Sequence, residues 1–143
     1  MEFSQSLSIQ APPRRVWQAI VDPKEVIRYH LAPLKEIQLK SGGRISYGTE
    51  DRDMIAGRIV HLEIGHRLDH TFRFLFSPET TGKDPETLVS YQIFETPAGS
   101  TLTLRHSGFP DENATFANIS GGWPSILDAL KNHLEGSAGS LGV

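Results

Sequence analysis

The stretch FANISGGWPSILDALKNHLEG, residues 116–136, decides the fold of this chain. Its apolar residues recur at steps of three and four, which is the spacing of one face of an α-helix: Phe116, Ile119, Trp123, Ile126, Leu127, Leu130 and Leu134. A helix with one apolar stripe has to bury that stripe against another layer of the protein. Pro124 predicts a kink or a new helix start near Trp123. Gly136 is a candidate C-cap, after which residues 137–143 are expected to form a flexible tail.

The layer that this helix covers is predicted to be a sheet. Before residue 116 the apolar residues alternate with polar ones, as Phe3, Leu7 and Ile9 do in the opening segment, and that alternation is typical of half-buried strands. Turn residues such as Ser41-Gly42-Gly43 separate the alternating segments. The pattern predicts seven strands, at about residues 3–10, 36–40, 45–47, 54–62, 67–76, 88–95 and 101–108.

Two short helices are expected directly after the first strand. Pro12-Pro13 stops a strand but suits the first turn of a helix, which needs no N–H group. The following helix is predicted over 14–21, and Asp22-Pro23 ends it and starts another over 24–29. The sequence therefore predicts one α+β domain over 1–136, in which a curved antiparallel sheet wraps around the long C-terminal helix.

The composition excludes several classes of protein. The chain has 143 residues, a formal net charge of −3 and no cysteine. Without a basic excess it is not expected to bind nucleic acid, and without cysteine it has no disulfide, thiolate nucleophile or cysteine-ligated zinc. No apolar run reaches the roughly 18 residues of a membrane span, and Met1 to Gln10 does not have the pattern of a signal peptide. A cytoplasmic, soluble protein is expected.

Several motifs carry a resemblance to a known family. Ala11-Pro12-Pro13 with Val16-Trp17-Gln18-Ala19-Ile20, then Gly57-Arg58-Ile59-Val60, and finally Gly122-Trp123 with Ile126-Leu127 occur in this order. This order resembles the START-like or SRPBCC superfamily, and within it the branch similar to the activator of the Hsp-90 ATPase (AHSA-type). The resemblance implies a helix-grip fold with a cavity between the sheet and the last helix. It also implies relatives that carry lipids, cyclise aromatic compounds or assist an Hsp-90-type chaperone in the stress response.

The expected register of the strands predicts which side chains face that cavity. A turn near Gly65 would pair Leu62 with Leu68 and Val60 with His70, and directly opposed residues share a face. A turn near Ala98-Gly99 would pair Leu104 with Ile93, and His106 with Tyr91. A shift of one residue in either turn would reverse the faces.

The predicted cavity lining combines these apolar, aromatic and histidine side chains with Arg58 on the parity of Val60 and with the two tryptophans. The full set is Trp17, Arg58, His70, Phe72, Phe74, Tyr91, Ile93, Leu104, His106 and Trp123. Such a wall, mostly hydrophobic with a few polar groups, is typical of a ligand pocket. The alternative for each histidine is a core position with a satisfied ring, for Arg58 a position at the rim, and for Trp17 and Trp123 a packing role.

Neither a metal site nor a catalytic constellation is expected. His66 and His70 lie about 13 Å apart along a strand, too far to share one ion, so neither a metal nor a cofactor is predicted. A cavity histidine could act as an acid or base, but the sequence provides no set of base, orienting group and oxyanion donor.

Three functions remain open at this point. The first is the binding of a small, largely hydrophobic molecule, lipid-like or aromatic and polyketide-like, without catalysis. The second is a co-chaperone-like protein–protein module that acts on an Hsp-90-type ATPase. The third is a cyclase or hydrolase that uses a cavity histidine. The chain is expected to be a monomer or a weak homodimer.

Overall fold

The computed structural model describes residues 1–75 and 84–141, and it contains one seven-stranded sheet with three helices. The strands are β1 (Phe3–Ile9), β2 (Leu34–Ile37), β3 (Arg44–Thr49), β4 (Arg52–Glu63), β5 (Arg67–Phe74), β6 (Thr87–Thr96) and β7 (Gly99–Ser107). The helices are α1 (Pro13–Val21), α2 (Pro23–Val26) and α3 (Ala114–Leu141). The predicted α+β helix-grip fold is confirmed.

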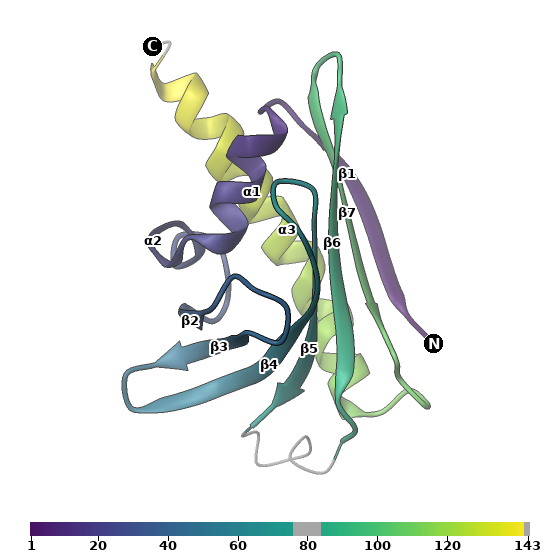
Figure 1. Ribbon diagram of the computed structural model, residues 1–143. Coiled ribbons are helices and arrows are strands. Elements are labelled where there is room, and N and C mark those ends of the chain that lie inside the picture. Colours follow the sequence, from purple (N-terminus) through teal and green to yellow (C-terminus); the bar gives the residue numbers. More distant parts are fainter. Residues whose placement is uncertain (76–83, 142–143) are drawn as a thin grey trace.

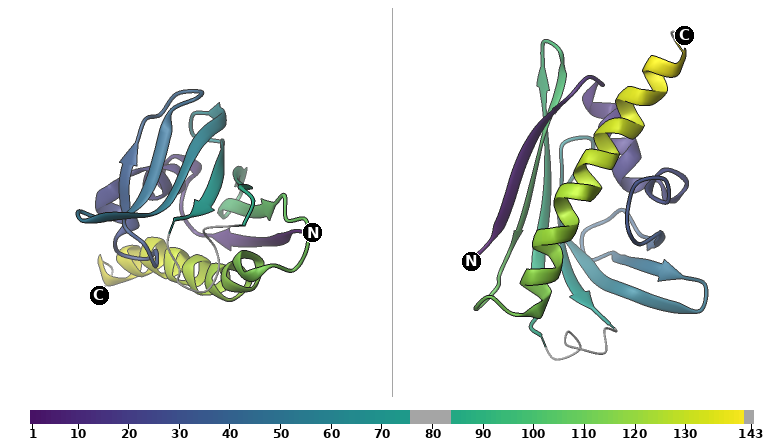
Figure 2. Two further views of the ribbon diagram at one scale, coloured as in Figure 1. Left: turned by 90° about the horizontal axis from the view of Figure 1, so that it is seen from below. Right: turned by 180° about the vertical axis from the view of Figure 1, so that it is seen from behind.

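All strand pairs are antiparallel, in the order β1-β7-β6-β5-β4-β3-β2. The sheet curves, and α3 crosses its concave side while α1 and α2 lie at one end beside α3 (Figures 1 and 2). The apolar stripe of α3 is buried in the core against this side, with Leu127 and Leu130 almost fully enclosed. The core therefore lies between one helix and one side of a single sheet, as the helical and strand spacings of the apolar residues predict.

Helix α3 continues unbroken through Pro124, so the predicted new start near Trp123 is wrong. Pro124 removes one backbone hydrogen bond, but buried residues on both sides of it hold the helix against the sheet, Trp123 before it and Leu127 after it. Asn113 begins the helix, since its side-chain oxygen accepts a hydrogen bond of 2.9 Å from the N–H of Phe116. The predicted C-cap at Gly136 is also wrong, because α3 ends at Leu141. The predicted tail over 137–143 includes 142–143, which lie outside the described residues, and it stays a prediction.

The register of β4 and β5 differs from the prediction by one residue over half of the pair. Leu62 lies opposite Leu68 as predicted, but an irregularity between Ile59 and His61 places Ile59, and not Val60, opposite His70. Ile59 is therefore fully buried and Val60 is half exposed. A β-bulge of this kind reverses the faces on one side of it, and no turn residue in the sequence marks its position.

The hairpin of β6 and β7 differs from the prediction by two residues. Tyr91 pairs with Leu104 and Ile93 with Leu102, because the turn consists of the two residues between Thr96 and Gly99. An even shift leaves every side chain on its predicted face. Tyr91, Ile93, Leu102 and Leu104 are accordingly all buried.

Candidate functional site

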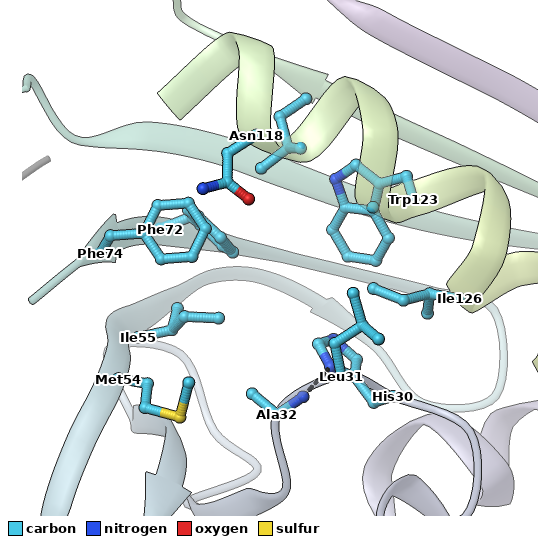
Figure 3. Close-up of a pocket in the computed structure, with 12 residues that line it drawn as sticks. His30, Leu31, Ala32, Met54, Ile55, Phe72, Phe74, Asn118, Trp123 and Ile126 are labelled. Atoms are coloured by element: carbon cyan, nitrogen blue, oxygen red, sulfur yellow. Dashed lines mark hydrogen bonds between the residues drawn. The ribbon is translucent and has the colours of Figure 1, made fainter. Parts of the chain in front are cut away.

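A cavity of about 330 Å³ lies between α3, β4, β5 and the loop from α2 to β2 (Figure 3). Each of these elements contributes to its wall. The lining residues in the described part of the chain are His30, Leu31, Ala32, Met54, Ile55, Phe72, Phe74, Asn118, Ile119, Gly122, Trp123 and Ile126. Apart from the indole N–H of Trp123, only His30 and Asn118 in this set carry polar side-chain groups, so the wall is almost entirely apolar.

The cavity exists because small residues occupy two of the facing positions. Ala32 is buried in the loop, and Gly122 lies on the face of α3 that is turned toward this loop. A Cβ atom at Gly122 would lie 3.6 Å from the Cδ1 atom of Leu31, which is ordinary van der Waals contact. Leu31 itself is 69% exposed although it lines the cavity, and it therefore lies at the mouth.

His30 has a fixed orientation in the cavity wall. Its Nδ1 atom accepts a hydrogen bond of 3.0 Å from the N–H of Ala32. Its ring stacks on Tyr47 with a centroid distance of 4.9 Å and meets Trp123 edge-on at 5.9 Å. Burial lowers the pKa of His30 to about 4, so the ring is neutral at pH 7.

A buried aromatic cluster lies behind this wall. The His70 ring stacks on Tyr91 at 6.1 Å and is tilted against Tyr47 at 6.3 Å. Its Nδ1–H donates to the carbonyl oxygen of Thr71 at 2.7 Å, and its Nε2 atom is buried without a hydrogen-bond partner in the described part of the chain. Burial lowers the pKa of His70 to about 4 and raises the pKa values of Tyr47 and Tyr91.

His106 belongs to a closed chain of hydrogen bonds. The Nε1–H of Trp123 donates to Nδ1 of His106 at 3.0 Å. The proton of the neutral ring is then on Nε2, which donates to the hydroxyl of Thr87 at 2.7 Å, and that hydroxyl donates to the carbonyl oxygen of Phe72 at 3.1 Å. Burial lowers the pKa of His106 to about 3. Both ring nitrogens are satisfied inside the protein, which is the structural alternative considered for this residue.

The structure brings together only part of the predicted lining set. Phe72, Phe74 and Trp123 line the cavity. His70, Tyr91 and His106 are buried on the same side of the sheet and contact one another or Trp123 through their rings. Their role in ligand binding stays a prediction.

The other predicted residues lie elsewhere. Trp17 on α1, Ile93 and Leu104 are core residues outside the cavity wall. The expected position of Arg58 on the inner wall is wrong, because the bulge in β4 turns its side chain to the outer face. There it is exposed and lines a separate groove with Arg44 and Arg73.

Sequence reasoning missed the residues that line the cavity from the loop between α2 and β2, from β4 and from part of α3. These are His30, Leu31, Ala32, Met54, Ile55, Asn118, Ile119, Gly122 and Ile126. Ile119, Gly122 and Ile126 belong to the helix stripe or its motif, which was recognised for packing. His30, Leu31 and Ala32 lie in an irregular loop, where no periodic pattern predicts the direction of a side chain.

The sequence matches the family described as activator of Hsp90 ATPase homolog 1-like protein over residues 10–135. The chain belongs to this family. A comparison of the sequence with curated proteins found no match. No helix within residues 1–75 and 84–141 is both long and apolar enough to cross a membrane.

Solved structures of similar fold include proteins from several organisms. A Mesorhizobium loti protein superposes with a TM-score of 0.79 at 20% identity, covering 94% of this chain and 97% of that one. The Aha1 dimer from Colwellia psychrerythraea gives 0.75 at 16% identity, covering 94% and 96%. An Hsp90 activator from Plasmodium falciparum gives 0.72 at 20% identity, covering 90% and 91%. At these identities the similarity shows the fold.

Proposed function

We propose that this protein binds a small, largely hydrophobic molecule in the cavity between β4, β5 and α3. The proposal rests on the apolar cavity of about 330 Å³. Ten of the twelve described lining residues are apolar, if the indole of Trp123 is counted among them, since its N–H is already hydrogen-bonded to His106. Pockets that bind small molecules start at about 300 Å³ and are mostly apolar with a few polar groups.

The size of the cavity limits the ligand. A volume of about 330 Å³ lies at the lower end of the range for pockets that bind small molecules. This is room for a compact molecule of one or two rings, but it does not hold the whole of a long-chain lipid. Of the two kinds of ligand considered from the sequence, the aromatic kind fits better.

Two glycines of α3 allow a matched test. Gly122 lines the cavity, whereas a Cβ atom at its neighbour Gly121 would meet no atom of the residues that the structure describes within 4 Å. Gly122→Leu should fill the cavity, and Gly121→Leu should leave it open. Both substitutions replace a helical glycine by a good helix former, so the two variants should gain similar helix stability.

Binding is measured with the uncharged two-ring fluorophore 1-naphthylamine, whose emission shifts to shorter wavelengths in apolar surroundings. The wild type and Gly121→Leu should bind it saturably and with similar affinity, while Gly122→Leu should bind it at least about tenfold more weakly, a loss of about 1.4 kcal/mol. Thermal unfolding and circular dichroism confirm that both variants are folded. Equal affinity of the two leucine variants, or no saturable binding by the wild type, would contradict the proposal.

A second candidate function is that of a co-chaperone-like module that acts on an Hsp90-type ATPase. In this case the outer surface of the sheet would bind the chaperone. This candidate is supported by the family match and by the fold shared with an Hsp90 activator. The test is the ATPase rate of an Hsp90-type chaperone with the purified protein in molar excess. Stimulation by the wild type and by Gly122→Leu alike would support this function, since it does not use the cavity; no stimulation at excess would exclude it for that chaperone.

A cyclase or hydrolase reaction at His70 or His106 is not proposed. Neither residue is part of the described cavity wall, and both ring nitrogens of His106 are used within the protein. No observation of the site favours catalysis over binding.

A further inference from the structure

The polar groups of the cavity restrict the charge of its ligand. No lysine, arginine, aspartate or glutamate is among the described residues that line it. A charged ligand group would lose its hydration on entering and would meet no opposite charge, at a cost of several kcal/mol. The cavity therefore selects against carboxylates and amines.

His30, in the wall of this apolar cavity, carries a hydrogen-bond donor that the described part of the protein does not use. Since its Nδ1 atom accepts from the N–H of Ala32, the proton of the neutral ring is on Nε2. That Nε2–H group has no partner among the residues that the structure describes. The contacts with Tyr47 and Trp123 fix the plane of the ring, so the donor points in one direction before any ligand arrives.

The opposite part of the cavity offers a different kind of group. Asn118 extends from α3 toward Phe72 and Phe74, away from His30 (Figure 3). Its amide can donate or accept. Between the two polar residues the wall includes the rings of Phe72 and Trp123, and Phe72 meets Phe74 edge-on with a centroid distance of 5.0 Å. Flat aromatic walls favour a flat guest.

We infer that the ligand is an uncharged molecule of one or two rings with a carbonyl-type oxygen that accepts a hydrogen bond from His30 Nε2–H. The inference rests on the proposed binding function and adds the chemical class of the ligand and the residue that selects it. A ligand oxygen at this position would satisfy a donor that the protein leaves unused. A hydrocarbon of the same shape would leave it unpaired.

The test compares three compounds built on the same two-ring system as competitors of bound 1-naphthylamine. Tetralin has no polar group, 1-tetralone adds the carbonyl oxygen, and 5,6,7,8-tetrahydro-1-naphthoate carries a carboxylate. The wild type should bind 1-tetralone about five- to tenfold more tightly than tetralin, the range expected of one net hydrogen bond. The carboxylate should not compete at concentrations at which 1-tetralone saturates.

The variant His30→Phe keeps an aromatic ring and removes the donor. It should lose the preference for 1-tetralone, so that the ratio of the two dissociation constants falls to about one, whatever the substitution does to the affinity for tetralin itself. Competition by tetralin still reports whether the cavity is intact. If the variant does not fold, the wild type labelled with ¹⁵N-histidine provides a second measurement, because the Nε2–H resonance of His30 should shift with 1-tetralone and not with tetralin.

The possible failures are distinct. If tetralin and 1-tetralone bind the wild type equally, or if His30→Phe keeps the preference for the ketone, this inference is overturned while the proposed binding function stands. Tighter binding of the carboxylate than of the ketone would overturn it as well. If none of the compounds displaces the fluorophore and Gly122→Leu has no effect, the proposed function itself fails.

Discussion

The buried histidines make the stability of the protein dependent on pH between about 7 and 5. Burial lowers the pKa of His30 and of His70 from the ordinary 6.5 to about 4, and that of His106 to about 3. In this pH range the unfolded chain binds protons at these three residues and the folded protein does not, so the free energy of unfolding falls as the pH falls.

The size of the effect follows from the three pKa values. A histidine with a folded pKa of about 4 or below costs about 2 kcal/mol of stability when the pH falls from 7 to 5, so the three residues together cost about 6 kcal/mol. This is a large share of the roughly 5–15 kcal/mol that stabilises a domain. Carboxylates whose pKa is lowered, such as Asp69 beside Arg67, act with the same sign, but mainly below the ordinary carboxyl pKa of about 4.

The assay is urea unfolding at pH 7, 6 and 5, followed by the fluorescence of the two buried tryptophans. In His70→Phe the loss of stability from pH 7 to pH 5 should be smaller than in the wild type by about 2 kcal/mol. Any constant cost of the substitution cancels, because the quantity compared is the difference between two pH values. The control His66→Gln removes an exposed imidazole and should keep the wild-type difference. A His70→Phe protein with the wild-type difference would refute the reasoning.

Two further predictions concern packing and hydrogen bonds in the core. Trp123→Phe and Thr87→Val each leave one nitrogen of His106 unpaired, and each should lower the free energy of unfolding in urea by about 1–3 kcal/mol. The double variant should lose less than the sum of the two single losses, because both hydrogen bonds belong to one chain of bonds. Strict additivity would contradict that coupling. A Cβ atom at Gly57 would lie 1.8 Å from a carbonyl oxygen of the neighbouring strand, so Gly57→Ala should cost at least about 2 kcal/mol, whereas Gly121→Ala, in open space, should be neutral or stabilising in the same assay.

The fold could be predicted from the sequence because it depends on two spacings of apolar residues, one typical of a helix and one typical of a strand. The stripe from Phe116 to Leu134 and the alternation in the strands each specify which side of an element is buried, and only one arrangement buries both. The errors lie at two single positions. At the bulge beside Val60 one extra residue in β4 shifts the alternation, whereas at Pro124 the helix continues although a proline was expected to interrupt it, because its buried neighbours hold it in place.

The candidate site could be predicted only in part, because parity gives the face of a side chain and not its position along the cavity. His70, Tyr91 and His106 are on the concave side as predicted, and neighbouring rings fill the space in front of them. Phe72 and Phe74, farther along β5, reach the cavity. Two residues can share one face of a strand although only one of them borders the cavity. The helix or loop packed opposite each residue decides this, and the spacing of residues along the strand does not reveal it.

The cavity is present because two positions opposite the rings of Phe72 and Phe74 have little or no side chain. At Gly122 the helix has no side chain, and at Ala32 the loop has only a methyl group, so the apolar wall of β5 faces a gap. A gap of this kind costs van der Waals contacts in the protein without ligand, and an apolar guest would restore them. The same loop supplies His30, so one short irregular segment both leaves the space and provides its unused donor. Selection of a ligand by this protein would thus depend on the loop between α2 and β2 more than on the histidines of the sheet, which serve the core.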